Sequence, residues 1–201
     1  MIPHSIHQIW IGPRPAPTDL MSTWHANHPD WDYREWGVED LDSLPWGPHR
    51  DIYDQYVNLK CWHGAADVAR VEILRSLGGV YVDSDMISMT PLDGAPFLNA
   101  TCFITESPHV RGRPQNAAMG SVPGSAVMRR YAERIASIPD LRPPWQAVGS
   151  GLLKKVIDRS VVMVPAPAFH PLKANGKRAS RWWDYAGPIY GKHLFHSTNG
   201  K

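Results

Sequence analysis

Hydrophobic and polar positions along the chain alternate between short apolar runs and longer segments with helical spacing. Apolar runs rich in β-branched and aromatic residues, each stopped by glycine, proline or polar residues, predict strands. These runs lie at residues 5–11, 32–36, 80–82, 101–105, 117–119 and 161–164. Helical spacing predicts helices over residues 18–27, 65–77, 125–137 and 149–157. Strands that alternate with helices indicate an α/β domain with a mostly parallel central sheet.

Other signals along the chain refine this outline. Thr18 and Ser125 are placed to cap their helices, because a side-chain oxygen there can accept a hydrogen bond from the first helical turn. Residues 38–60 have helical tendency but are interrupted by Pro45, Gly47 and Pro48. The pattern contains no internal repeat, and it favours one domain over residues 1–201.

The helix predicted over residues 65–77 carries two charges inside its apolar arc. On a helical wheel, Glu72, Arg75 and Ser76 fall on the side expected to face solvent, whereas Asp67 and Arg70 fall among apolar side chains. Burying an unpaired charge is costly. Asp67 and Arg70 therefore either pair with each other, three residues apart, or point from the end of the core into a ligand site.

An acidic triplet follows the apolar strand at residues 80–82. Asp83 and Asp85 flank Ser84, at the end of a strand where ligands usually bind in an α/β sheet. Two carboxylates suit a hard divalent ion such as Mn²⁺ or Mg²⁺, and such an ion can bridge a diphosphate. Because Asp-x-Asp is also common in surface turns, the triplet alone leaves both interpretations open.

Composition limits the classes of function. The chain has 201 residues, 43% of them hydrophobic, with a net charge of only +2, which is typical of a globular protein and argues against a nucleic-acid partner. A local basic stretch at residues 173–181 is either a solvated loop or a loop that faces a phosphate or a membrane. Nine tryptophans supply flat apolar faces that suit either core packing or stacking on bases and sugars.

The two cysteines and the absence of a long apolar run bear on location. Two cysteines, Cys61 and Cys102, are too few for a disulfide scaffold, so we expect free thiols. No secretory signal precedes residue 12, and no apolar run approaches the length of a membrane span. We expect a cytoplasmic protein, in contact with membranes at most peripherally.

One longer pattern connects the predicted helix to the acidic triplet. Asp67 is followed three residues later by Arg70, and then come Gly78-Gly79, Tyr81 and the triplet Asp83–Asp85. This order resembles the DXD-containing sugar-binding region of a glycosyltransferase family, which includes fungal α-mannosyltransferases, bacterial capsular sugar transferases and, more distantly, the glucosylating domain of large clostridial toxins. Residues 6–12 also resemble the opening strand of that family. The resemblance is specific over residues 1–12 and 62–91.

The resemblance implies a GT-A fold and a metal-dependent, retaining transfer of a sugar from a nucleotide-sugar donor. The acceptor, whether glycan, lipid or protein, is not identified by the sequence. The family pattern implies that Asp83 contacts the ribose or the metal and that Asp85 binds the metal directly, with Mn²⁺ or Mg²⁺ as the cofactor. Arg70 joins these two aspartates as the third candidate catalytic residue, because a fixed positive charge can stabilise the transition state.

The same resemblance implies substrate-binding roles for further residues. Trp10 is expected to stack on the nucleotide base, Asp67 and Arg70 to hold the donor sugar, and Tyr81 to line the nucleotide or sugar site. Core packing is the alternative for Trp10 and Tyr81. Asn116, a polar residue after a predicted strand, is a weaker substrate-binding candidate.

The C-terminal segment offers a third metal ligand. It contains His193 and His196, and the latter matches best the histidine with which related folds close the metal site. A solvated C-terminal histidine is the alternative.

Two other classes of function share parts of the pattern. Metal-dependent phosphohydrolases and nucleotidyltransferases also place Asp-x-Asp after a strand, but they usually need further acidic residues, and only Asp93 and Glu106 are close in sequence. A non-catalytic carbohydrate-binding module would use exposed tryptophans, and it would have no need of Asp67, Arg70 and Asp85 together.

Overall fold

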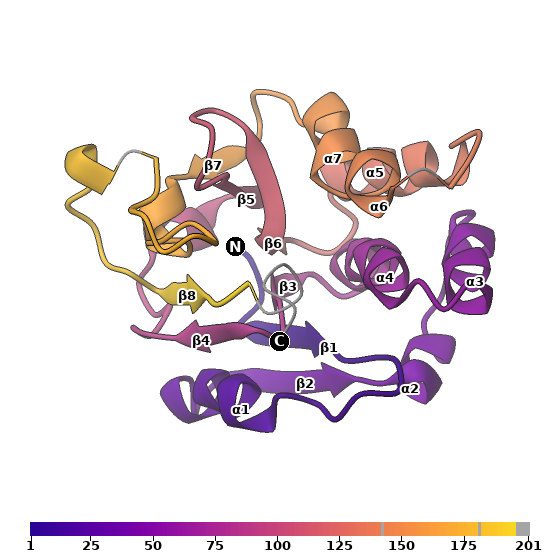
Figure 1. Cartoon of the computed structure of the whole chain (residues 1–201), viewed down its shortest axis with the longest axis horizontal. Coiled ribbons are helices and arrows are strands. Elements are labelled where there is room, and N and C mark those ends of the chain that lie inside the picture. Colours follow the sequence, from indigo (N-terminus) through magenta and orange to yellow (C-terminus); the bar gives the residue numbers. More distant parts are fainter. Residues whose placement is uncertain (142, 181, 196–201) are drawn as a thin grey trace.

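The computed structural model describes residues 1–141, 143–180 and 182–195. Its centre is a six-stranded sheet with the order β2-β1-β3-β6-β5-β7 (Figure 1). The strands are β1 (Ser5–Ile9), β2 (Asp32–Trp36), β3 (Gly79–Val82), β5 (Cys102–Glu106), β6 (Pro114–Ser121) and β7 (Val162–Val164). Only β6 is antiparallel to its neighbours among these strands, so the sheet is mostly parallel, as predicted.

The helices agree closely with the sequence pattern. They are α1 (Thr18–Asn27), α2 (Val38–Asp42), α3 (Arg50–Asn58), α4 (Trp62–Ser76), α5 (Ala126–Ala136), α6 (Pro144–Ala147) and α7 (Ser150–Val156), with 3₁₀ turns η1 (Pro96–Asn99), η2 (Ala166–Ala168) and η3 (Trp182–Asp184). Ser125 caps α5 through a hydrogen bond from the Met128 amide, whereas Thr18 is the first residue of α1 rather than its cap. Within the described ranges, no helix has both the length and the apolar character needed to cross a bilayer.

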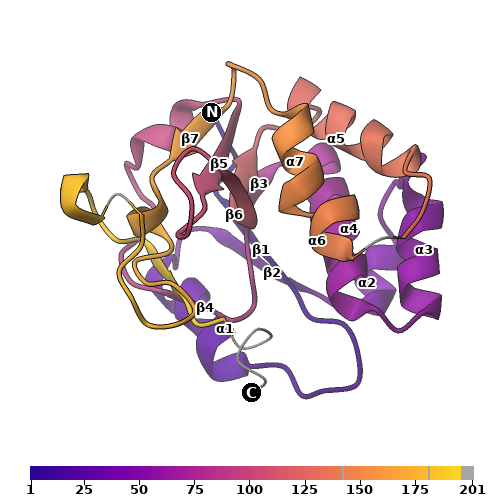
Figure 2. The ribbon, with the colours of Figure 1, turned by 45° about the horizontal axis from the view of Figure 1, so that its top comes forward.

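The sheet separates two apolar cores. Helices α3 to α7 gather on one side of it (Figure 2), where their side chains form the larger core with residues such as Tyr53, Leu74 and Met119. The other core is rich in aromatic rings and includes Trp24, Phe103 and Phe169. Both layers bury apolar surface against the sheet, which holds the ends of its strands in fixed positions.

A second, two-stranded sheet was not predicted from the sequence. It pairs β4 (Met86–Ser88) with β8 (Gly191–His193) in antiparallel register, with Met86 opposite His193. Trp24 in α1 supports it by donating a hydrogen bond from its indole N–H to the Met86 carbonyl, at 2.8 Å. Three-residue strands carry little period-two signal, which is why the pattern alone missed them.

The double glycine before β3 is required by close packing. Gly78 and Gly79 have φ values of +71° and +90°, in the region that favours glycine. A Cβ atom on Gly78 would lie 2.6 Å from the Pro123 ring, and one on Gly79 would lie 2.8 Å from Nε2 of His7. The turn thus brings α4 directly into the strand that carries the acidic triplet.

The expectation that Glu72 faces solvent is wrong. Its side chain is fully buried, with a carboxylate oxygen 3.2 Å from Nε2 of His49 and both oxygens hydrogen-bonded by Arg75. The helical wheel assigned only one buried face to α4. The segment directly before α3, which includes Pro45 and His49, covers a second face. Burial by itself opposes ionisation of Glu72, yet the hydrogen bonds from His49 and Arg75 outweigh it and lower its pKa.

Candidate active site

A cleft of about 990 Å³ opens at the carboxyl ends of β1 and β3. The start of the antiparallel strand β6 reaches the same edge of the sheet, and α4 forms one wall. All the described residues that the sequence singled out line this cleft: Trp10, Asp67, Arg70, Tyr81, Asp83, Asp85 and Asn116. The remaining candidate, His196, lies outside the described residues.

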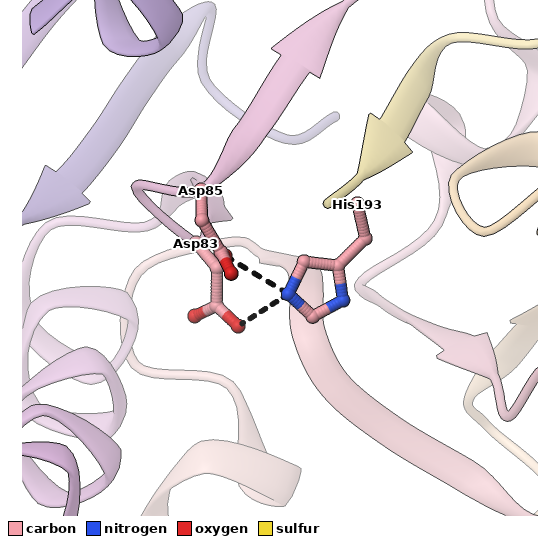
Figure 3. A group of neighbouring side chains, drawn as sticks. All are labelled: Asp83, Asp85 and His193. Atoms are coloured by element: carbon pink, nitrogen blue, oxygen red, sulfur yellow. Dashed lines mark ion pairs between the residues drawn. The ribbon is translucent and has the colours of Figure 1, made fainter. Parts of the chain in front are cut away.

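Asp83, Asp85 and His193 converge inside the cleft (Figure 3). Nε2 of His193 lies 2.9 Å from Oδ1 of Asp85 and 3.8 Å from Oδ2 of Asp83. One possible ligand atom from each residue lies within 4.8 Å of the others. This grouping was expected for the two aspartates, while the histidine is a different one from the His196 that the sequence favoured.

The backbone around the triplet is held on several sides. The Asp83 amide donates to the Ala117 carbonyl at 2.8 Å, and the Gln8 side chain donates to the Asp83 carbonyl at 3.2 Å. The Ser84 hydroxyl donates to the carbonyl of Ile9 at 2.5 Å. Neighbouring strands therefore hold the backbone from which both carboxylates project, which pre-organises the site for a ligand.

The three side chains fit a divalent cation by their chemistry. Two carboxylates and one imidazole nitrogen supply oxygen and nitrogen ligands, and three ligands from the protein leave further positions open for a substrate. When such an ion is bound, it acts as a Lewis acid on diphosphate oxygens.

Arg70 connects the helix to the triplet. Its guanidinium lies 3.0 Å from Oδ1 of Asp67 and 3.0 Å from Oδ1 of Asp83, and it donates to the Asn116 carbonyl at 2.7 Å. It also lies over the Tyr81 ring, 4.5 Å from its centroid. Although burial would lower the pKa of Arg70, the carboxylates of Asp83 and Asp67 more than offset this and raise it. The planar guanidinium thus bridges two carboxylates while it lines the cleft.

Both interpretations of the Asp67–Arg70 pair therefore hold in part. The two residues form an ion pair, and both line the cleft. Asn116 donates from its side-chain amide to the same Asp67 oxygen at 2.8 Å, and a Cβ on Gly149 would lie 2.9 Å from the other. Close packing and hydrogen bonds thus position Asp67 from both sides.

Burial shifts the pKa values of Asp83, Asp67 and Tyr81. It raises the pKa of Asp83 and of Asp67, and the positive charge of Arg70 opposes the rise in each case. Burial also raises the pKa of Tyr81 well above its ordinary value, so its hydroxyl stays protonated and donates to Oδ1 of Asp83 at 2.9 Å.

Trp10 lines the cleft directly after the end of β1. Its ring is half-buried, and its indole N–H donates to the Arg14 carbonyl at 2.8 Å. The chain turns at Gly12, with φ +107°, where a Cβ would lie 2.9 Å from the Trp62 ring. Two indole rings therefore line the same cleft, and only one of them was predicted.

Other cleft residues were missed by sequence reasoning. They are His63 in the first turn of α4, His109 from the loop after β5, and His193 and Phe195 at the end of the described chain. Only His193 carried a signal, as one of two histidines in a segment already suspected of holding a metal ligand. His109 and Phe195 lie outside the helices and strands, and His63 lies in the first turn of α4 with no signal of its own.

The fold resembles those of solved glycosyltransferases. The structure titled "PaToxG Glycosyltransferase" superposes with a TM-score of 0.66 at 15% identity, covering 77% of this chain and 67% of that one. The UDP-bound glycosyltransferase domain from the YGT toxin gives a TM-score of 0.51 at 13% identity, covering 67% of this chain and 61% of that one. The described fold is that of a GT-A glycosyltransferase, as the sequence predicted.

The sequence comparisons point to the same class of protein. Residues 17–103 match the family described as "Glycosyltransferase sugar-binding region containing DXD motif", which confirms the resemblance inferred from the residues themselves. An uncharacterized glycosyltransferase of Acanthamoeba polyphaga mimivirus is 32% identical over 140 residues, covering 63% of this chain. The chain spans 53% of the length of that relative. The matched segment and the fold are both similar to those of glycosyltransferases.

Proposed function

We propose that this chain transfers a sugar from a nucleotide-sugar donor to an acceptor, with retention of configuration and with Mn²⁺ or Mg²⁺ at Asp83, Asp85 and His193. One observation carries the proposal. Two carboxylates and an imidazole converge in a cleft that also presents Trp10 and a guanidinium. A diphosphate needs positive charge at its oxygens, a base needs an apolar face, and the cleft offers both.

The roles of the protein's own groups follow from their positions. Asp83, Asp85 and His193 would hold the cation, and Arg70 and Tyr81 hold Asp83 in its orientation through the contacts described above. Asp67 and Asn116 lie together at the wall of the cleft, where we place the donor sugar. Trp10 is the surface on which we place the base. The departing diphosphate then leaves from a site whose dipoles and charges are already oriented.

The structure favours this function over the two alternatives. A phosphohydrolase would need further free carboxylates at the triplet. Asp67 lines the cleft but is held by Arg70 and Asn116. Glu106 accepts a hydrogen bond from the Gly112 amide, Asp93 accepts one from Trp31, and neither lines the cleft. A carbohydrate-binding module would display tryptophans, yet the exposed Trp145 and Trp183 lie outside the cleft.

Uridine is the first base to test, because one structural neighbour is a glycosyltransferase domain with UDP bound. We place the protein in the cytoplasm, since both Cys61 and Cys102 are free thiols. The acceptor is treated in the next subsection.

The test is ligand-induced stabilisation followed by turnover. UDP with Mn²⁺, each well above its dissociation constant, should raise the melting temperature by about 5–10 °C, since saturation near 100 times Kd contributes about 2.7 kcal/mol. UDP with EDTA should give little shift. A panel of UDP-sugars then identifies the donor through Mn²⁺-dependent hydrolysis to UDP.

The matched variants are Asp85→Ala and, as a control, Asp51→Ala, an exposed aspartate on α3. We expect the first to stay folded and lose both the Mn²⁺-dependent shift and turnover, and the second to keep both. Full turnover in a folded Asp85→Ala protein would overturn the metal assignment.

A further inference from the structure

Two loops at the edge of the cleft are joined by hydrogen bonds into one surface. The loop at residues 107–113 connects β5 to β6, and the segment at residues 172–184 leads from η2 toward β8. Ser180 binds them together, because its amide donates to the Pro108 carbonyl and its hydroxyl donates to the Ser107 carbonyl, both at 2.8 Å. We call residues 107–113, 172–180 and 182–184 the basic-aromatic face.

Large apolar side chains project from this face into solvent. Trp183 is 83% exposed and belongs to η3, the short yellow helix at the left edge of Figures 1 and 2. Val110 is 49% exposed, on the loop that meets η3 through the Arg111–Asp184 contact at 3.9 Å. An isolated domain gains nothing in stability from a tryptophan held in water, so this position suggests a partner.

The charges around these apolar groups are almost all positive. Within the described residues of the face, Asp184 is the single acid, against the basic side chains Arg111, Arg113, Lys173, Lys177 and Arg178. The Arg178 guanidinium lies over the Trp183 ring, 4.5 Å from its centroid. A partner surface that meets Trp183 therefore also meets Arg178.

A small hollow with cationic side chains lies between the face and α7. Its volume is about 330 Å³, and it is lined by Val110, Arg111, Gly112, Arg113, Gly151 and Lys154. Three of these residues are cationic, and the two glycines leave backbone close to the opening. A phosphate group is an anion that such a hollow can hold, with arginine suited to it by its planar fork of donors.

The face also borders the cleft. His109 lies in the first loop and Ala174 in the second, and both line the cleft that holds the acidic triplet. Whatever binds the basic-aromatic face is thereby brought to the cleft's edge.

We infer that the basic-aromatic face docks on an anionic lipid surface, with a headgroup phosphate in the hollow and Trp183 and Val110 at the level of the headgroups. Tryptophan is favoured at membrane interfaces because one part of the ring is apolar and the N–H remains hydrated, and arginine and lysine are attracted to anionic lipids. Both features occur here on one surface. As far as it concerns the acceptor, the inference rests on the function proposed above: the acceptor is then a molecule presented at the membrane surface.

Vesicle co-sedimentation tests the docking without donor or acceptor. The purified chain is mixed with vesicles of phosphatidylcholine alone or of phosphatidylcholine with phosphatidylglycerol, at low and high salt. We expect binding only to the anionic vesicles, weakened by salt. Trp183→Ser should weaken it about tenfold, the effect of withdrawing one large apolar side chain from the interface. Lys154→Glu should weaken it about fivefold or more, since each basic residue near the surface contributes on that scale.

Two control variants make the same kinds of change, loss of a tryptophan and reversal of a positive charge, away from the basic-aromatic face. Trp145→Ser removes another half-exposed tryptophan, on α6, and Arg134→Glu reverses an exposed charge on α5. Both should bind vesicles like the wild type. Equal binding to neutral vesicles, binding that survives Trp183→Ser and Lys154→Glu, or no binding at all would each overturn the inference; in the last case an acidic protein becomes the partner to seek. UDP–Mn²⁺ stabilisation, measured in solution on the same samples, reports separately on the proposed function.

Discussion

His193 reaches Asp85 through strand pairing, so that two residues far apart in sequence lie 2.9 Å apart between Nε2 and Oδ1. The strands β4 and β8 pair with Met86 opposite His193, and the Leu194 amide donates to the Asp85 carbonyl at 3.0 Å. The imidazole is thus brought to the acidic triplet by backbone hydrogen bonds. Any ligand held by the three side chains is also linked to the folding of the C-terminal segment.

This arrangement makes His193, rather than His196, the expected third ligand. His193→Ala should weaken Mn²⁺ binding at least tenfold, because even residues that only support a ligand typically contribute 10–100-fold to metal affinity. His196→Ala, three residues later, is the matched control and should bind Mn²⁺ like the wild type. Isothermal titration with Mn²⁺ in the presence of UDP measures both. The reverse order of effects would restore the assignment made from the sequence.

Arg70→Lys should lower stability as well as activity. The sequence left open whether Arg70 pairs with Asp67 or points into a ligand site. In the structure Arg70 is only 5% exposed and bridges Asp67 and Asp83. Lysine keeps the charge without the planar fork, so one carboxylate loses its partner. We expect part of the roughly 3–5 kcal/mol that breaking a buried ion pair costs.

The activity of the same variant tests its link to the metal site. Because Arg70 orients Asp83, Mn²⁺ affinity should fall together with transfer. Chemical denaturation, Mn²⁺ titration and donor turnover on one preparation separate these effects. Unchanged Mn²⁺ affinity would mean that Arg70 serves the sugar directly and does not position Asp83.

Sequence reasoning succeeded where local chemistry determines structure. The helix over residues 18–27 and the strand over residues 32–36 match α1 and β2 at both ends, because periodicity and turn residues act within a few positions. The acidic triplet and Arg70 could be found because they lie in one continuous segment. Glu72 was wrongly expected to face solvent, because it is buried against His49. That residue lies on a turn outside the helix, and a helical wheel considers only the residues of one helix. His63, His109 and the β4–β8 pairing depend on tertiary contacts in the same way.

His7 should make the protein sensitive to mild acid. Burial lowers its pKa from 6.5 to about 4, and the neutral ring is held between the Gly78 carbonyl, 3.0 Å from Nε2, and the Trp36 indole N–H, 3.3 Å from Nδ1. A histidine that is neutral when folded binds its proton more readily when unfolded. Its contribution to stability is therefore fully present above pH 6.5 and is lost as the pH falls toward 4.

The expected size of this effect is about 2 kcal/mol of unfolding free energy between pH 7.5 and pH 5. Urea unfolding at the two pH values gives the loss for the wild type and for His7→Gln. The variant should be less stable at pH 7.5, since it loses the two hydrogen bonds, but its loss on acidification should be smaller by that amount. Equal losses in the two proteins would show that His7 is not the group responsible.

The final prediction concerns which tryptophan meets the base. Trp10 and Trp62 both line the cleft, and the Trp62 ring packs against the turn at Gly12, so both can respond to a bound nucleotide. If the base stacks on Trp10, fluorescence quenching by UDP with Mn²⁺ should largely disappear in Trp10→Phe and persist in Trp62→Phe. Trp145→Phe, outside the cleft, should quench like the wild type. Phenylalanine keeps an aromatic face, so UDP affinity should fall only modestly in Trp10→Phe, and calorimetry would confirm that the nucleotide still binds when the quench is lost. A quench that survives in Trp10→Phe but disappears in Trp62→Phe would move the base to the other ring and leave Trp10 to shape the loop through its hydrogen bond to Arg14.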